Sequence, residues 1–391
     1  MIFVLSVGVF FERSYGMPKQ ENSTEHETPQ KARPGQEITL EIRDLAFGGK
    51  GVGRHDGIAC FVPGVIDGER VRARIRRVKS RLLEADLLEV LEPSPHRVPA
   101  PCPVFLNCGG CAYQHIDYPH QLRIKEGQLR EALRRLGGFS EPPVAAMIPS
   151  PEPYGYRNRI TVHVRGGDAG FYAEGSNRVV PVKKCLIASG EVDLGFQELL
   201  KSRPRDGDYL IGEKKRYGGF RQVNNAVAGI LKKTVTEAVR PRDREPVSEL
   251  LVDAYCGAGF FAHELQGHFT KVIGIERSIA SVAMASRQAA PNEEYLAGDV
   301  ERMLSEALAA GSPAGTVLLL DPPSEGLDER AVEAILERPP ARIVYVSCNP
   351  PTLARDAKRL SERYRLQVVT PLDMFPQTAE IESVSVLEPL P

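Results

Sequence analysis

A glycine-rich turn followed by an acidic strand end is the first group of residues that could bind a ligand. The segment Asp253-Ala-Tyr-Cys-Gly257-Ala-Gly259 closes the apolar run LLVDAY and precedes a helical stretch. Glycines let the backbone approach a ligand closely, and turn amides at a helix N-terminus favour an anionic group. Glu276 ends the next apolar run, KVIGIE, where a carboxylate can bind ribose hydroxyls. Together these features indicate a cofactor that carries adenosine, although the glycine turn alone would be a weak indication.

A second candidate is Asp321-Pro-Pro-Ser324, at the end of the apolar run TVLLL. Many methyltransferases use an Asp-Pro-Pro loop at a strand end to bring the substrate to the methyl donor. Enzymes that methylate nitrogen usually place an aromatic residue after the prolines, and Ser324 in that position disfavours a nitrogen target. The alternative is a plain turn, since Pro-Pro also simply ends strands.

Cys348, in Ser347-Cys348-Asn349-Pro350, is a candidate nucleophile. C5 of a uracil ring is too poor a nucleophile to accept a methyl group directly, and a thiolate added at C6 gives C5 enolate character. A base must then remove the C5 proton before the thiolate leaves, and Glu382, at the end of DMFPQTAEIE, is the candidate. By itself a cysteine at a strand end is more often inert, because reactivity needs positive charge or a helix dipole nearby.

Cysteines also crowd into a short segment, Cys102-x5-Cys108-x2-Cys111, with Cys185 as the expected fourth member. Four thiolates suit zinc or an iron–sulfur cluster, and spacing cannot choose between them. Free buried cysteines are the alternative. For Cys60 and Cys256 we expect burial as small apolar side chains.

The elements that position these residues are strands and helices that alternate in the last part of the chain. The apolar runs are LLVDAY, KVIGIE, TVLLLDPP, RIVYVSCNP, LQVVTPLDMF and SVSVLEP. Nearly continuous apolar strands between amphipathic helices predict a mainly parallel sheet covered on both faces, an α/β Rossmann-like fold. Before it, short runs with glycine turns over 38–92 predict a small β-barrel, and Tyr118 to Leu136 reads as a helix that ends at Gly137-Gly138.

Composition places any nucleic-acid contact in local patches, because the formal net charge is only −1. In ERVRARIRRVKSR, arginines 72, 74 and 76 alternate with apolar residues, so a strand would present a row of guanidinium groups suited to phosphates, or merely a solvated face. Residues 1–34 are expected to form a disordered tail, with Met1 or Met17 as the start. The apolar start is too short to span a membrane, and the cysteine usage suits a reducing cytoplasm.

The chain is similar to the bacterial and archaeal RNA uracil-5-methyltransferase family, in particular its iron–sulfur-containing 23S rRNA branch. The resemblance is carried by RIVYVSCNPPTLARD (342–356), FRQVN (220–224), DAYCGAG, DPP and DMFPQTAEIES. It implies a class I methyltransferase fold that uses S-adenosyl-L-methionine (SAM), with Cys348 as nucleophile and Glu382 as base. It further implies SAM contacts from Gln222, Tyr255, Glu276, Asp299 and Asp321, and a [4Fe-4S] cluster on Cys102, Cys108, Cys111 and Cys185.

The same resemblance makes the barrel a TRAM-like RNA-binding module and turns Tyr156-Arg157-Asn158-Arg159 toward RNA. We expect a TRAM-like, OB-like barrel at 35–93, an α+β iron–sulfur middle domain at 94–221 and the methyltransferase domain at 222–391. The expected partner is RNA, 23S rRNA or alternatively tRNA, and the expected state is a monomer. The chain departs from the family pattern at Phe260, Ser324 and Glu380, which affects the surroundings of the bound base.

Two rival interpretations remain at the level of sequence. A cytosine-5 RNA methyltransferase would use the same thiolate logic, but a second cysteine near Pro-Pro is expected there and residues 321–327 contain none. An RNA-binding iron–sulfur protein without catalysis is the other rival, and the presence of Cys348 and Glu382 counts against it.

Overall fold

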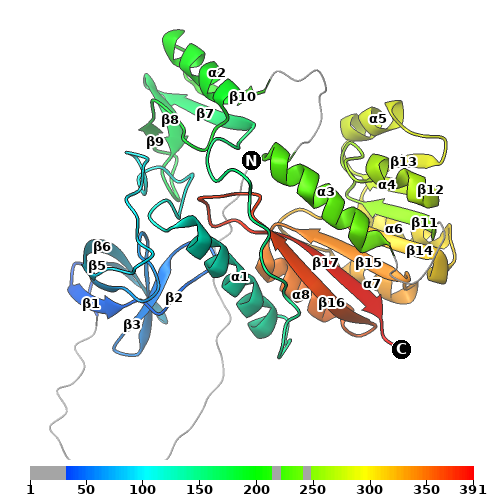
Figure 1. The fold of residues 1–391 in the computed structure, drawn as a ribbon, viewed down its shortest axis with the longest axis horizontal. Helices are drawn as coiled ribbons and strands as arrows, with labels where there is room; N and C mark the ends of the chain where they lie inside the picture. Colours follow the sequence, from blue (N-terminus) through cyan, green and yellow to red (C-terminus); the bar gives the residue numbers. More distant parts are fainter. Residues whose placement is uncertain (1–31, 214–221, 241–247) are drawn as a thin grey trace, which may run out of the picture.

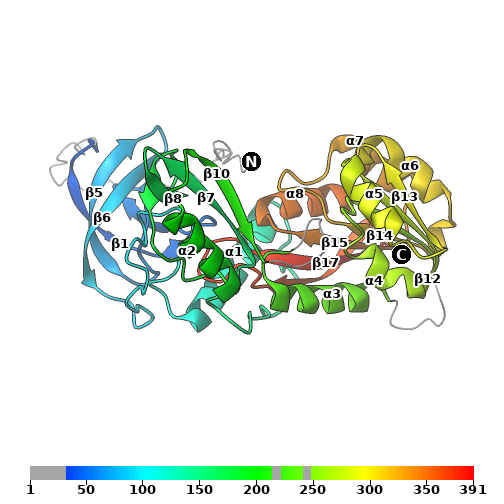
Figure 2. The ribbon, with the colours of Figure 1, turned by 90° about the horizontal axis from the view of Figure 1, so that it is seen from above.

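The computed structural model describes residues 32–213, 222–240 and 248–391. Residues 1–31 of the predicted tail, and Phe220 and Arg221 of the FRQVN segment, lie outside the described residues. Two lobes share an elongated shape: one holds the barrel, a small second sheet and helix α1, and the other holds the large sheet with its helices (Figures 1 and 2). No helix within the described ranges is long and apolar enough to cross a membrane.

The barrel lobe begins with a six-stranded sheet in the order β1-β5-β6-β4-β3-β2. Its strands are β1 Glu37–Glu41, β2 Asp44–Leu45, β3 Gly51–His55, β4 Ile58–Val62, β5 Arg70–Val78 and β6 Leu82–Glu92. Along β5 the apolar residues Val71, Ala73 and Ile75 are buried and the arginines between them are exposed. The period of two therefore sends one face of the strand into a core shared with β1, as the sequence predicts.

The middle of the chain contributes α1 and a four-stranded sheet, β10-β7-β8-β9, covered by α2. These elements are α1 Tyr118–Arg135, β7 Arg159–Arg165, β8 Asp168–Tyr172, β9 Val179–Pro181, α2 Gly190–Lys201 and β10 Gly207–Gly212. The predicted helix α1 is confirmed. It begins at Asp117, whose carboxylate accepts from the His120 amide, and ends just before Gly137-Gly138.

A seven-stranded sheet in the order β13-β12-β11-β14-β15-β17-β16 forms the second lobe. Its strands are β11 Ser248–Ala254, β12 Phe269–Glu276, β13 Glu293–Ala297, β14 Thr316–Leu320, β15 Arg342–Ser347, β16 Tyr364–Leu372 and β17 Glu382–Pro389. The first five strands of that order run parallel, and β17 lies antiparallel between β15 and β16. The α/β fold class is confirmed.

Helices cover both faces of this sheet, and each face has its own apolar core. The helices are α3 Asn225–Val239, α4 Ala262–Leu265, α5 Ile279–Arg287, α6 Val300–Ala309, α7 Glu329–Glu337 and α8 Pro350–Leu360, with short 3-10 turns at Gln266–His268 and Pro313–Gly315. Helices α1, α6, α7 and α8 pack on one face, and α3 and α4 pack on the other. Because α1 belongs to the first lobe in sequence, it joins the two lobes through its buried Leu129 and Leu133.

Candidate active site

The carboxyl ends of four parallel strands bring the predicted chemical groups to one edge of the sheet. Ala254 at the end of β11 pairs with Ile275 of β12 and Leu320 of β14, and Leu320 in turn pairs with Tyr345 of β15. The glycine turn, Glu276, Asp321 and Cys348 each follow or end one of these strands. This is the edge at which open α/β sheets bind ligands.

The glycine turn and Glu276 form one unit. The Glu276 carboxylate accepts from the Gly257 amide at 3.1 Å and from the Ser278 amide at 2.7 Å, one bond on each oxygen. Each oxygen therefore keeps a lone pair for a ligand hydroxyl. Tyr255 enters the turn with a left-handed φ of +67°, and its buried hydroxyl has no hydrogen-bond partner in the described structure. These unfilled polar positions fit the binding of an adenosine-bearing ligand.

The other two predicted cofactor residues considered with this unit are Asp299 and Gln222. Asp299 follows β13 at the start of α6, where it faces Arg277 and Arg302 at 3.5 and 3.8 Å, and the neighbouring Gly298 amide donates to the Glu276 carbonyl. Gln222 is buried before α3, where its carbonyl accepts from Asn158 Nδ2 at 2.7 Å. No described hydrogen bond or ion pair connects the Gln222 side chain to the glycine turn.

Asp253 belongs to the same edge, although the sequence interpretation gave it no role. It is fully buried, and one carboxylate oxygen accepts from the Ala262 amide at 3.1 Å across the turn. Burial, and next the charge of Asp321, raise the pKa of Asp253 well above its usual value. The sequence feature that could have identified Asp253 is its position at the start of DAYCGAG. We interpret Asp253 as a residue that stabilises the glycine turn.

Cys348 is exposed immediately after β15. Partial loss of water around the thiol, together with the negative charges of Glu382, Asp321 and Glu380, raises the pKa of Cys348 to about 12. In the free protein the thiol is therefore protonated at neutral pH, and a positive charge would have to enter the site to make it a thiolate.

Glu382 begins β17, which pairs with β15, the strand that Cys348 follows. Ser347 pairs with Ser383 across β15 and β17, and Ser383 Oγ donates to the Ser347 carbonyl at 3.3 Å. Glu382 is only 3% exposed. Burial, with the charges of Asp321 and Glu380 adding to it, raises the pKa of Glu382 well above its usual value. The predicted nucleophile and base thus lie next to each other, from positions 34 residues apart in the chain.

Asp321 is the third carboxyl of this group, and burial raises its pKa to about 7. The loop that follows it is tied to the cysteine loop, because Asn349 Nδ2 donates to the Ser324 carbonyl at 2.9 Å. The other amide atom, Asn349 Oδ1, is buried without a partner. Asn349 stands in the motif beside Cys348 but was not among the predicted site residues. Carboxyls with raised pKa values suit a positively charged ligand, since such a ligand stabilises their ionised forms.

The four predicted metal-binding cysteines line one cavity of about 280 Å³ in the middle of the chain. Burial raises the pKa of Cys111 to about 12 and also raises the pKa values of Cys108 and Cys185, whereas backbone amides of Gly110, Ile187 and Ala188 act in the opposite direction. Among the described residues, no group of three or more Cys, His, Asp or Glu side chains is placed to hold a metal ion. Cys60 and Cys256 are buried, as predicted.

The arginine row of β5 exists, but it does not present free positive charge. Arg72 lies 2.8 Å from Glu89 of β6, Arg74 lies 2.8 Å from Glu37 of β1, and Arg76 faces Glu84 and Asp86. Neighbouring strands therefore supply carboxylates to each of the three guanidinium groups. The expectation for Tyr156-Arg157-Asn158-Arg159 is wrong for two residues, because Tyr156 and Asn158 are buried and bonded inside the protein.

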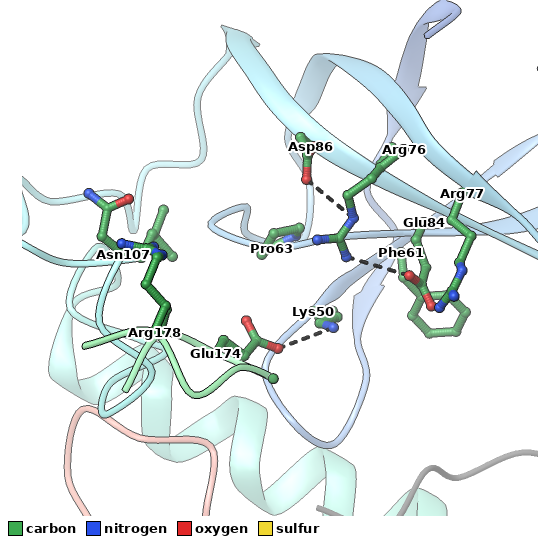
Figure 3. Close-up of a pocket in the computed structure, with 14 residues that line it drawn as sticks. Lys50, Phe61, Pro63, Arg76, Arg77, Glu84, Asp86, Asn107, Glu174 and Arg178 are labelled. Carbon is green, nitrogen blue, oxygen red and sulfur yellow. Dashed lines mark hydrogen bonds and ion pairs between the residues drawn. The ribbon is translucent and has the colours of Figure 1, made fainter. Parts of the chain in front are cut away.

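A cavity of about 620 Å³ lies between the barrel and the small second sheet (Figure 3). Lys50 of the barrel and Glu174 of the middle segment form an ion pair across it at 3.2 Å. Arg77 and Arg178 also line the cavity, and within the described ranges neither has an ion-pair partner. Positive charge that could meet a phosphate is thus better placed here than on the row of β5.

Comparisons with known proteins agree with this geometry. The family model "tRNA (Uracil-5-)-methyltransferase" matches residues 312–389, and the TRAM domain matches 31–88. An uncharacterized RNA methyltransferase of Gloeobacter violaceus is 33% identical, over 90% of this chain and 97% of that protein. A similar protein of Bdellovibrio bacteriovorus is 32% identical, over 90% and 95%.

Among solved structures, the tRNA (uracil-54, C5)-methyltransferase of Pyrococcus abyssi in complex with S-adenosyl-L-homocysteine has a TM-score of 0.66 and 26% identity. That match covers 90% of this chain and all of the other. It extends over the barrel as well as the large sheet, whereas a shared methyltransferase fold alone would account only for the latter. The chain belongs to the family of SAM-dependent RNA uracil-5-methyltransferases.

Proposed function

We propose that the chain methylates C5 of a specific uridine in folded RNA through a covalent bond between Cys348 Sγ and C6 of the ring. The observation that carries this proposal is the placement of Cys348 directly after β15 and of Glu382 at the start of the neighbouring strand β17, at the edge that also holds the glycine turn. The target base must leave its stack to reach the thiol, as in other enzymes that act on ring atoms.

The proposed steps use the two side chains in sequence. The Cys348 thiolate adds to C6 and moves electron density to C5, which takes the methyl group. Glu382 then removes the proton from C5, the C5–C6 double bond re-forms and the C6–S bond breaks, which returns the thiolate. SAM, when bound, supplies the electrophilic methyl group and a positive charge. Glu382 must be ionised for its step, although its burial disfavours that state in the free protein.

We assign SAM binding to Gln222, Tyr255, Glu276, Asp299 and Asp321. Glu276 would accept from the ribose hydroxyls through the lone pairs that Gly257 and Ser278 leave free. The buried Tyr255 hydroxyl, which has no partner in the described structure, and the Asp321 carboxyl lie at the same edge of the sheet. A cationic ligand would lower the pKa of Asp321 and of Cys348 together.

We also propose that Cys102, Cys108, Cys111 and Cys185 hold a [4Fe-4S] cluster. Their shared cavity and the backbone amides near Cys108 and Cys185 support a site for several thiolates. Four thiolates suit zinc as well as an iron–sulfur cluster, and the resemblance to the iron–sulfur-containing branch of the family is the reason for proposing the cluster.

For the RNA we propose 23S rRNA first, on the combination of the cysteine motif with the barrel. tRNA is the second candidate, because the Pyrococcus abyssi protein named above is a tRNA methyltransferase. We further propose that the chain has three domains, at 35–93, 94–221 and 222–391, and that it acts as a monomer in the cytoplasm. Mapping 5-methyluridine in both RNAs, from cells with and without the gene, decides between the two substrates.

The test of the chemistry is Cys348→Ala with RNA that carries [5-³H]uridine. Loss of tritium release, with SAM binding retained, supports the nucleophile. The matched control is Cys60→Ala, which removes a buried thiol from the barrel and should release tritium as the wild type does. Unchanged release from Cys348→Ala would exclude the mechanism and favour an RNA-binding protein or another nucleophile.

A further inference from the structure

The loop between β16 and β17 carries Glu380 and leads directly into Glu382, and it reaches away from its own sheet. In Figure 1 this loop, residues 373–381, extends toward α1 and the first lobe. Three successive carbonyls of the loop accept hydrogen bonds from three different segments of the N-terminal half. The donors are Lys125 Nζ to Phe375 at 3.0 Å, Tyr156 Oη to Pro376 at 3.0 Å, and the amides of Ala112 and Tyr113 to Gln377 at 2.9 and 3.0 Å.

Gln377 is the residue of the loop that is bonded to the first lobe through its carbonyl, its backbone N–H and its side chain. It is 2% exposed and adopts a left-handed φ of +69°, which is uncommon for a residue with a side chain. The side chain of Gln121 in α1 makes two hydrogen bonds to it: Gln121 Nε2 donates to Gln377 Oε1 at 3.0 Å, and the backbone N–H of Gln377 donates to Gln121 Oε1 at 3.2 Å. Surrounding structure of this kind is what keeps a sparsely populated backbone conformation in place.

The start of the loop is fixed from the same side. Lys125 and Asp373 form an ion pair at 2.6 Å with both side chains fully buried. Tyr118 Oη donates to the second oxygen of Asp373 at 2.8 Å, so the carboxylate is bonded on both oxygens. A buried pair with every partner in place is rigid, and removal of one partner leaves an uncompensated charge.

The far end of the loop has few such bonds. The Glu380 amide donates to Thr378 Oγ1, within the loop itself, and Glu382 then begins β17 opposite Leu372. Glu382 is thus held on one side by its pairing with Leu372 in the sheet and on the other by a loop whose fixed points are residues 375–377. The donors that hold Gln377 directly follow Cys111, so the segment of the cysteine cavity and the segment of the base are joined by two backbone hydrogen bonds.

We propose that Gln121 and Tyr156 are positioning residues for the proton-abstraction step, acting through the carbonyl and amide groups of residues 375–377 on Glu382. This inference rests on the proposed function, because it takes Glu382 as the base. It assigns to α1 and to the cysteine segment a role in one step of the reaction rather than in folding alone.

The test is a single-turnover reaction of the full chain with SAM and an unmodified transcript of 23S rRNA or tRNA, whichever the wild type methylates. Samples quenched in denaturant are resolved on a denaturing gel, where the covalent RNA–protein adduct runs as its own band. A mispositioned base leaves addition and methyl transfer intact but delays release. For Gln121→Ala we expect adduct formation within about twofold of the wild type and decay about tenfold slower, a part of the about 10²–10⁴-fold that a general base contributes.

Gln128→Ala is the matched control. Gln128 is also a buried glutamine of α1, but its Nε2 donates to the carbonyls of Leu45 and Ala46 and to the Tyr113 hydroxyl instead of to the 373–381 loop. We expect both adduct formation and decay to stay within about twofold of the wild type. Tyr156→Phe is the second variant, because it removes only the donor to Pro376 and keeps the shape of the side chain.

The outcomes distinguish failure of the positioning role from failure of the proposed nucleophile. Slow decay in Gln121→Ala or Tyr156→Phe, with normal formation and a normal KM for RNA, supports the positioning role. Equal slowing of formation and decay, equal effects of Gln121→Ala and Gln128→Ala, or wild-type decay in soluble Gln121→Ala and Tyr156→Phe overturns it. No adduct from the wild type with either RNA would instead overturn the proposed nucleophile, and this inference with it.

Discussion

Replacement of Glu382 with glutamine should stabilise the free protein at neutral pH and have no such effect in acid. Glu382 is 3% exposed, and burial followed by the charges of Asp321 and Glu380 raises its pKa well above the usual 4.5. Below pH 4.5 the carboxyl is protonated in both the folded and the unfolded chain, so it adds no pH dependence there. Above that pH the unfolded carboxyl ionises while the folded one keeps its proton. Stability is therefore lost as pH rises, up to the folded pKa.

The size of the effect follows from the linkage. Each pH unit between the two pKa values removes about 1.4 kcal/mol from the free energy of unfolding of the wild type. Glutamine has the same shape and does not titrate, so the difference between Glu382→Gln and the wild type should grow by that amount per unit. For a domain of the size of the methyltransferase lobe, this corresponds to about 3–6 °C in Tm per pH unit. The pH at which the difference stops growing gives the folded pKa.

The assay is thermal unfolding of both proteins without ligand, followed by circular dichroism at pH 5, 6, 7 and 8. Glu333→Gln is the matched control, because it is the same substitution at an exposed position of α7 whose charge is not among those that act on Glu382. Its Tm difference from the wild type should stay nearly constant with pH. Parallel curves for Glu382→Gln and the wild type would refute the reasoning, since they would mean that the Glu382 carboxyl ionises as readily in the folded protein as in water.

Three further predictions concern ligands. Glu276→Ala should weaken SAM binding about 10- to 100-fold by calorimetry, because it removes an ionised acceptor and releases the Gly257 turn, while RNA binding stays unchanged. Arg77→Ala and Arg178→Ala should each lower the slope of RNA affinity against salt by up to about one unit, measured by filter binding between 50 and 200 mM salt; an unchanged slope would remove the cavity of Figure 3 from the RNA path. Cys108→Ser should lower the iron content and visible absorbance of anaerobically purified protein, whereas Cys60→Ser should leave both unchanged; equal iron in the two variants would contradict the cluster.

The large sheet could be predicted from the sequence because its signal is local. In TVLLL every residue is buried, and in RIVYVS all but the first are, as expected for strands covered on both faces. The carboxyl ends of parallel strands must share an edge, so the grouping of Glu276, Asp321 and Cys348 followed from the strand boundaries alone. The antiparallel insertion of β17 between β15 and β16 did not, and it is this insertion that places Glu382 beside Cys348.

Features that depend on distant segments could not be read from patterns. Periodicity showed which face of β5 carries Arg72, Arg74 and Arg76, but the carboxylates that neutralise them come from strands whose register the sequence does not give. Tyr156 stands in a polar segment that looks exposed. It is nevertheless buried, and its hydroxyl donates to the carbonyl of Pro376, 220 residues later.

The electrostatic interactions of the site also join residues that lie far apart in the sequence, so patterns in the sequence do not predict them. These interactions constrain the order in which Cys348 and Glu382 can ionise. Negative charge on Glu382 raises the pKa of Cys348, so ionisation of the base opposes ionisation of the nucleophile. The proposed reaction needs a thiolate first and a carboxylate afterwards. A positive charge near Cys348 lowers the pKa of the thiol, and later loss of that charge with the methyl group would push the Glu382 pKa upward, just as the base must take a proton. The negative charges of the carboxyls therefore oppose thiolate formation until a positively charged methyl donor is present, and the loss of that positive charge makes Glu382 a stronger base once the methyl group has been transferred.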